Sequence, residues 1–155
     1  MPIALDVDDD QRLFHETTVR FIETELPRER TRELHDDPVG FESAWLSASA
    51  ELGWYSMLVP EEHGGGSVSG ASMADAALVA EELGRHVQPG PFVPMNVALA
   101  AVAAHGSDRL REEVVPPGVA GHQVLTWAPL DDRGRWDLGA GLSLSRDEGG
   151  FVLVG

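Results

Sequence analysis

The chain has 155 residues, 43% of them hydrophobic, and a formal net charge of −15, because 26 acidic residues face 11 basic ones, all of them arginine. Nucleic acid and membrane surfaces are therefore excluded as expected partners, since their phosphates would repel so acidic a chain. The absence of cysteine excludes disulfides, thiolate catalysis and iron–sulfur clusters.

The first third of the chain predicts two helices separated by charged residues. A first helix follows Asp8–Asp10 and stops at Pro27, and its apolar stripe comprises Leu13, Phe14, Thr17, Phe21, Ile22 and Leu26. Residues 28–33 are interpreted as a solvated charge run. Asp37-Pro38 predicts the start of a second helix, as an N-cap followed by proline, and Gly53 predicts its end.

The middle of the chain predicts an ordered loop and three more helices. The loop covers residues 54–66, and Ser69 is expected to cap a helix that Gly84 ends. Residues 92–105 are apolar nearly all round, which favours a helix in the centre of a bundle. Ser107 is expected to cap a short helix over 108–115, and the Pro-Pro-Gly sequence at 116–118 to end it.

The pattern changes after residue 118. Residues 123–128 predict a strand, and residues 142–146 and 151–154 predict a hairpin around a turn at 147–150. The expected fold class is therefore mostly α: a helical bundle over 1–118, followed by an incomplete antiparallel β segment over 119–155. An isolated hairpin is marginally stable in water, so we expect further chain or a partner to complete the sheet.

Several short motifs suggest chemistry, and each has a structural alternative. His63-Gly64-Gly65-Gly66 matches the oxyanion loop of lipases, but Val68 occupies the position where their nucleophile elbow needs serine, so a structural glycine turn is favoured. The histidines show no metal-ligand spacing, and the acidic cluster at 6–10 lacks the pattern of a calcium loop. No metal site is predicted.

The aromatic residues have two interpretations. Trp45, Trp54, Tyr55 and Phe92 are most simply core residues, whose large apolar surfaces favour burial. Trp127 and Trp136 belong to the β segment, where they would either pack on the sheet or flank a planar ligand.

Five stretches together resemble the acyl-CoA dehydrogenase family. They are ELGW at 51–54, VPEEHGG at 59–65, AEELGR at 80–85, PGPF at 89–92 and the Gly-Ser pair at 106–107. The resemblance covers about residues 10–128, with a looser match to the end. The GRWD sequence at 134–137 is similar to an actinobacterial subgroup that acts on bulky or steroid-derived thioesters.

The resemblance implies an enzyme with an N-terminal helical domain, a middle β domain and a C-terminal helical bundle. Such enzymes bind FAD and remove an α proton and a β hydride from an acyl-CoA, giving a trans-2-enoyl-CoA. They assemble as homo- or hetero-oligomers. A cytoplasmic location is expected on separate grounds, because the N-terminus has no basic n-region and no segment is long and apolar enough to span a bilayer. The glutamate base of the family lies in the C-terminal part, so no catalytic residue is assigned, and Glu61 and Glu62 belong to the loop motif.

The resemblance also places the cofactor contacts at Thr126, Trp127 and Ala128. The flavin-contacting strand of the family usually ends in Thr-Glu-Pro, and alignment on Pro129 puts Trp127 and Ala128 at the threonine and glutamate positions. Thr126 would replace the threonine only after a one-residue slip, which turns its side chain to the opposite face of a strand. Autonomous flavin binding is therefore in doubt.

Three functional hypotheses remain open at this point. The first is the N-terminal part of an acyl-CoA dehydrogenase that is catalytic only when complete. The second is a non-catalytic subunit, or a helical interaction module, that pairs with an active dehydrogenase. The third is a flavin monooxygenase or nitroalkane-oxidising enzyme on the same fold, because a fold alone does not fix a reaction.

Overall fold

Helix α1 (Asp9–Glu25) begins at a capping box. The Asp8 carboxylate accepts a hydrogen bond from the Gln11 amide at 2.7 Å, and the Gln11 side chain accepts one from the Asp8 amide at 3.3 Å. The computed structural model describes residues 7–128, 130, 133–136, 142–147 and 149–154. The predicted first helix is therefore confirmed, with Phe14 and Ile22 buried, whereas Leu13 is 65% exposed and faces solvent.

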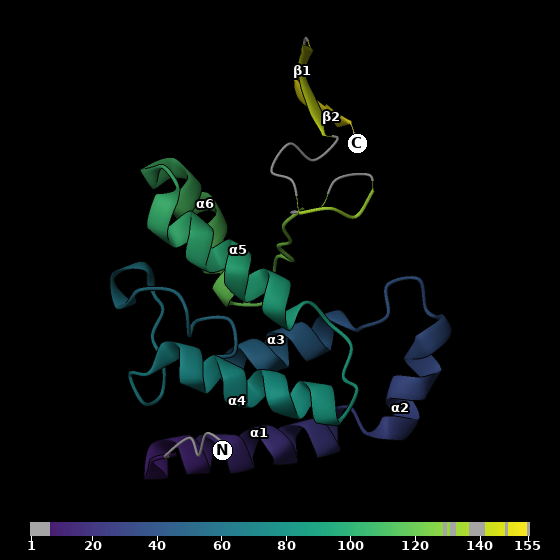
Figure 1. Cartoon of the computed structure of the whole chain (residues 1–155), viewed down its shortest axis with the longest axis vertical. Coiled ribbons are helices and arrows are strands. Elements are labelled where there is room, and N and C mark those ends of the chain that lie inside the picture. Colours follow the sequence, from purple (N-terminus) through teal and green to yellow (C-terminus); the bar gives the residue numbers. More distant parts are fainter. Residues whose placement is uncertain (1–6, 129, 131–132, 137–141, 148, 155) are drawn as a thin grey trace.

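The described residues form six α-helices, two short 3-10 helices and one hairpin, which confirms a mostly α fold (Figure 1). The helices after α1 are α2 (Arg28–Glu33), η1 (Leu34–Asp36), α3 (Ser43–Glu51), η2 (Glu61–His63), α4 (Ser72–Arg85), α5 (Phe92–His105) and α6 (Asp108–Val119). Strands β1 (Ser143–Asp147) and β2 (Gly150–Val154) follow. No helix among these residues is long and apolar enough to cross a bilayer.

An aromatic cluster forms the centre of the core. Trp45, Trp54, Tyr55 and Phe92 are all buried, as predicted. Phe21 stacks on Trp45 with ring centroids 5.0 Å apart, and the Trp54 ring meets Trp45 and Phe92 edge-on at 5.7 and 6.0 Å. These rings join α1, α3, α5 and the loop after α3, so the core fixes where that loop lies.

Two predicted helix starts are wrong for related reasons. Asp37 does not cap α3; its carboxylate accepts the amides of Val39 and Gly40 at 2.8 and 3.0 Å, which closes a turn and lowers the pKa of Asp37. Ser69 does not cap α4, because its hydroxyl and amide both donate to Asp75. In each case a local side-chain bond competes with helix capping.

Two predicted helix ends are wrong, and the charge run of residues 28–33 forms a helix that is solvated as expected. Gly84 lies inside α4, which ends at Arg85. Pro116 and Pro117 lie inside α6, because proline is compatible with helical φ and its carbonyl still accepts the bonds that close the helix end. The Ser107 cap of α6 is confirmed, with its hydroxyl accepting the Leu110 amide.

Helix α5 is apolar all round but is not enclosed on every side by the described residues. Met95 and Leu99 are fully buried, whereas Val93 is 55% exposed and Ala101 is also exposed. Helix α6 packs beside it, where Gly118 allows a close approach: a Cβ at Gly118 would lie 2.7 Å from Leu99 Cδ2.

The hairpin is confirmed and the strand before it is not. Strands β1 and β2 pair antiparallel, with Ser143 opposite Val154 and Asp147 opposite Gly150, and all their residues are exposed. The described residues 123–128 have no strand pairing; they run on from α6 as an extended connection (Figure 1). The expectations for Asp6, Pro129 and Asp137 fall outside the described residues.

Candidate functional site

The loop from Trp54 to Gly66 is held by backbone hydrogen bonds and by buried side chains. Gly53 adopts φ +78° after α3, and the Trp54 amide donates to the Ser49 carbonyl, which closes the helix end. The following turns bury Tyr55, Met57 and Val59, so the loop is fixed on the core from its first residues. The loop was correctly predicted to be ordered.

The glycines of this loop do not offer an oxyanion hole. The amides of Gly64, Gly65 and Gly66 donate to the carbonyls of Glu61, Pro60 and Ser56 at 3.0, 3.1 and 3.1 Å. An oxyanion hole needs amide donors that are free to bind the developing negative charge, and these three are engaged by backbone carbonyls. The structural glycine turn is therefore the correct interpretation of the motif.

Glycine is required in this turn for a steric reason. A Cβ at Gly65 would lie 1.9 Å from the Val59 carbonyl oxygen, a distance at which backbone atoms would have to move. Gly64 adopts φ +80°, a left-handed conformation that glycine adopts without strain. The motif that carries the family resemblance is thus a backbone fold, not a set of reactive side chains.

A hollow of about 520 Å³ separates this loop from α6. Its lining includes His63 of the loop, His122 after α6 and Glu51 of α3. His63 is half-buried and its Nε2 is 3.7 Å from a Glu62 carboxylate oxygen. Within the part of the chain that the structure describes, no group of His, Asp and Glu side chains is arranged to hold a metal ion.

The segment predicted to contact a flavin leaves the helical domain beside this hollow. Leu125 anchors it, because its partly buried side chain packs on the core. The side chain lies so close to Gly118 that a Cβ built there would be only 2.8 Å from Leu125 Cδ1. Beyond this anchor, Thr126, Trp127 and Ala128 are exposed. The structure thus places these three residues together on one exposed segment, where a hydroxyl and an indole ring are accessible.

The two tryptophans of this region contact one another. The rings of Trp127 and Trp136 have centroids 5.8 Å apart and planes inclined by 55°. Trp127 is 42% exposed and Trp136 is 76% exposed. The pair therefore packs ring against ring rather than flanking an open slot, although both rings keep a solvent-facing surface.

Sequence reasoning missed a buried carboxylate that positions the neighbouring elements. Asp75 is fully buried at the start of α4 and accepts bonds from the Ser69 amide, the Ser69 hydroxyl and Gln11 Nε2. Burial alone would raise the pKa of Asp75, but these hydrogen bonds outweigh it and hold the pKa below its ordinary value. The signal was available: Asp75, Ala76 and Val79 follow helical spacing on one face, and a carboxylate there needs donors.

Comparisons with known proteins agree on one family. A model described as the acyl-CoA dehydrogenase N-terminal domain matches residues 8–122. The acyl-CoA dehydrogenase IpdE2 of Mycolicibacterium smegmatis is 28% identical over 120 residues, which make up 77% of this chain and 38% of that protein. The protein of the same name from Mycobacterium tuberculosis is 40% identical over 68 residues, 43% of this chain and 20% of that protein. The matched region is well under half of each relative's length.

Solved structures show the same fold. The Tcur3481-Tcur3483 steroid acyl-CoA dehydrogenase superposes with a TM-score of 0.75 at 26% identity, over 95% of this chain and 40% of the other. An acyl-CoA dehydrogenase from Bacillus anthracis, in complex with FAD, gives a TM-score of 0.74 at 24% identity, over 97% of this chain and 26% of that one. The ChsE4-ChsE5 complex from Mycobacterium tuberculosis gives a TM-score of 0.73 at 21% identity, over 100% of this chain and 40% of the other.

Proposed function

Because this chain belongs to the acyl-CoA dehydrogenase family, we propose that it is the N-terminal part of an FAD-dependent enzyme that oxidises an acyl-CoA thioester between its α and β carbons. The observation that carries the proposal is the family match over residues 8–122, together with the tightly bonded loop of residues 54–66. The chain spans 38% of the Mycolicibacterium smegmatis relative, so the activity belongs to the assembly that includes the remaining domains.

The proposed division of the chain follows its change of structure. We assign residues 1–118 to the helical domain and 119–155 to the start of the middle β domain. Helix α6 ends at Val119, and the paired strands among the described residues all come later. The fully exposed hairpin would gain its cover from further strands of that β domain.

Residues 126–128 are chemically compatible with one wall of a flavin site. The Thr126 hydroxyl is exposed and available as a donor, and Trp127 offers an aromatic surface. When bound, FAD would supply the hydride acceptor of the reaction. In this proposal the chain has three roles: Leu125 anchors the wall, the helical domain packs against one side of the acyl chamber, and both exclude water from it.

The partners in this proposal are an acyl-CoA substrate and further acyl-CoA dehydrogenase subunits. Two structural neighbours, Tcur3481-Tcur3483 and the ChsE4-ChsE5 complex, are each named for two proteins, which supports a hetero-oligomer as well as a homo-oligomer. The name of the first neighbour specifies a steroid enzyme, which supports a bulky or steroid-derived acyl group here. A cytoplasmic location belongs to the same proposal and stays a prediction.

A second candidate is a non-catalytic subunit that pairs with an active dehydrogenase. It is favoured by one observation: Trp127 and Ala128 stand where the resemblance leads us to expect threonine and glutamate. Loss of the flavin-facing hydroxyl and carboxylate would leave the fold intact, since both residues are exposed and outside the core.

One experiment separates these candidates. The complete reading frame is expressed alone and with candidate partner subunits, flavin absorbance is recorded, and acyl-CoA oxidation is assayed with an artificial electron acceptor. Flavin and turnover in the complete protein alone support the first candidate. Turnover only with a partner, with flavin bound solely by that partner, supports the second. Neither flavin nor turnover in any combination would contradict both.

A further inference from the structure

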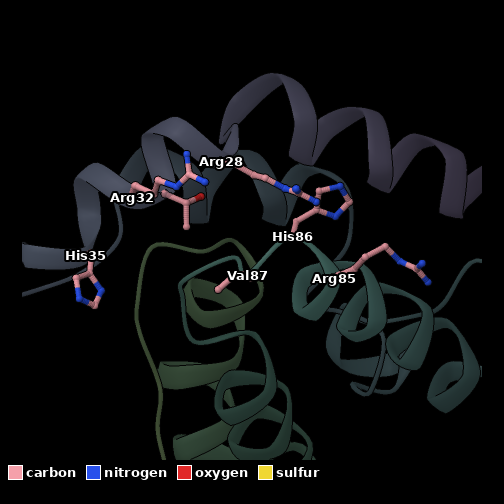
Figure 2. A pocket seen from close by; sticks show the side chains of 7 residues that line it. Arg28, Arg32, His35, Arg85, His86 and Val87 are labelled. Atoms are coloured by element: carbon pink, nitrogen blue, oxygen red, sulfur yellow. The ribbon is translucent and has the colours of Figure 1, made fainter.

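A groove between α2 and the end of α4 gathers positive charge on an acidic protein. Its volume is about 590 Å³, and its lining comprises three arginines, two histidines, one threonine and one valine (Figure 2). No carboxylate is among these residues, although acidic residues outnumber arginines by 26 to 11 in the whole chain. The nearest carboxylates to His86 are those of Glu23 and Glu82, 3.9 and 3.6 Å from its ring nitrogens.

Two of the arginines are free to bind a ligand. Arg28 and Arg32 lie four residues apart on α2, so their side chains project from the same face. Neither has an ion-pair partner within the part of the chain that the structure describes, whereas Arg30 on the same helix pairs with Glu33 and Glu42. Figure 2 shows the Arg28 side chain reaching toward His86, the residue after α4.

The α4 side of the groove is held rigidly. Arg85 is paired with Glu81 at 2.6 Å and Glu82 at 3.1 Å, so its charge is already balanced. His86 Nδ1 lies 2.9 Å from the Glu82 carbonyl oxygen, which only accepts, so Nδ1 carries the hydrogen. The imidazole is thereby fixed in orientation beside Arg28.

A strained backbone at the groove is an independent observation. Val87 adopts φ +54°, a left-handed conformation that is an outlier for a β-branched residue. It occupies the position after α4 that glycine usually takes, because the Gln88 amide donates to the Leu83 carbonyl at 2.8 Å. Strained residues cluster at functional sites, and this one lies in the lining of the groove.

We propose that this groove binds a soluble small molecule through a phosphate or diphosphate group, held by Arg28 and Arg32. Each guanidinium presents a planar set of N–H donors that matches phosphate oxygens, and two of them balance a doubly charged group. The volume lies within the range of small-molecule sites, roughly 300–1,000 Å³. A phosphate on a lipid headgroup has the same chemistry, but the net charge of −15 favours a soluble ligand over an anionic surface.

The test is calorimetric titration of the complete protein with pyrophosphate. The double variant R28Q/R32Q should weaken binding by at least roughly tenfold, because two charge-assisted contacts are lost. The control is the double variant R20Q/R109Q, which removes the same charge from exposed positions on α1 and α6 outside the groove and should keep affinity within about twofold. Equal weakening in both variants, or none in either, would overturn the proposal.

Arginine footprinting locates the ligand. Pyrophosphate should protect Arg28 and Arg32 from phenylglyoxal and leave Arg20 reactive, as read by peptide mass spectrometry. If Arg28 and Arg32 are unreactive without pyrophosphate, the groove is covered in the complete protein and the proposal fails. Acetate that binds as tightly as pyrophosphate, or binding seen only with phosphatidic acid vesicles, would likewise overturn a soluble phosphate site.

Discussion

Gln11 and Asp75 are 64 residues apart in the sequence, yet Gln11 Nε2 donates a 2.8 Å hydrogen bond to Asp75 Oδ1 in the buried contact between α1 and α4. Gln11 is also part of the capping box that starts α1, and Ser69 binds the same carboxylate from the loop before α4. One carboxylate thus fixes two helix starts and the loop between the glycine turn and α4.

The substitution Asp75→Asn should lower the free energy of unfolding by about 1–3 kcal/mol, because an amide offers one acceptor oxygen to donors that now bind two. Chemical denaturation of the complete protein measures this. Glu16→Gln, an exposed change on α1, is the matched control and should stay within about 0.5 kcal/mol. Equal losses in the two variants would contradict the role given to Asp75.

The effect of Asp75 should depend on pH in one direction. The folded-state pKa of Asp75 lies below its ordinary value, so the ionised carboxylate stabilises the fold above the unfolded-state pKa of about 3.9 and this contribution is lost as pH falls through the folded-state pKa. The difference between wild type and Asp75→Asn should therefore be largest near neutral pH and shrink below about pH 4. A difference that stays constant into acid would show that Asp75 acts without its charge.

Two glycine-to-alanine substitutions should act in opposite directions. Gly65→Ala places a Cβ 1.9 Å from the Val59 carbonyl oxygen. It should destabilise the fold by about 4 kcal/mol, which is in the upper range for single substitutions. Gly84→Ala lies inside α4 with nothing within 4 Å of its Cβ, and should stabilise by roughly 0.5–1 kcal/mol. Thermal unfolding of both variants measures the contrast, and a tolerated Gly65→Ala would contradict the assigned loop geometry.

The helical core could be predicted because its signals are local and periodic. Phe14 and Ile22 follow helical spacing, and Trp45, Trp54 and Phe92 carry so much apolar surface that burial is their simplest state. The Ser107 cap and the glycine after α3 were also readable from the sequence, since each acts within one helical turn.

The predicted helix bounds are wrong where one side chain can form either of two local hydrogen bonds, or where a residue distant in the sequence determines which bond forms. Asp37 caps a turn instead of a helix, and both roles use the same carboxylate. Ser69 is taken by Asp75, whose burial depends on Gln11 in another helix. Pro117 continues α6 because its carbonyl still accepts bonds at the helix end.

The candidate sites were predictable to different degrees. Thr126, Trp127 and Ala128 were placed by family resemblance alone, and residue patterns contain no independent signal for them. Arg28 and Arg32 were interpreted as part of a solvated charge run, because their shared groove with α4 exists only after the two helices come together. The charge pattern of residues 28–33 does not show which surface of another helix will lie opposite them, or which side chains that surface presents.

The strained residue at the end of α4 yields a stability prediction. Val87→Gly should stabilise the fold by about 1 kcal/mol, since relief of the left-handed conformation of a branched residue exceeds the added chain entropy of glycine. Val93→Gly, at an exposed valine in the first turn of α5, is the control and should destabilise by roughly 0.5 kcal/mol. If both variants lose stability, Val87 is not strained in solution.

The flavin wall proposed at residues 126–128 can be tested at one hydroxyl. Thr126→Val in the complete, flavin-loaded assembly removes the hydroxyl at nearly constant volume, and flavin retention should fall by roughly tenfold if that hydroxyl contacts the ring. Because Thr126 is exposed and outside the core, the melting temperature of the flavin-free protein should not change, which separates a lost contact from a lost fold. Thr24→Val, at an exposed position on α1, controls for the loss of a hydroxyl elsewhere. Unchanged flavin retention in Thr126→Val would remove Thr126 from the site and favour a subunit whose flavin, if any, is held by its partner.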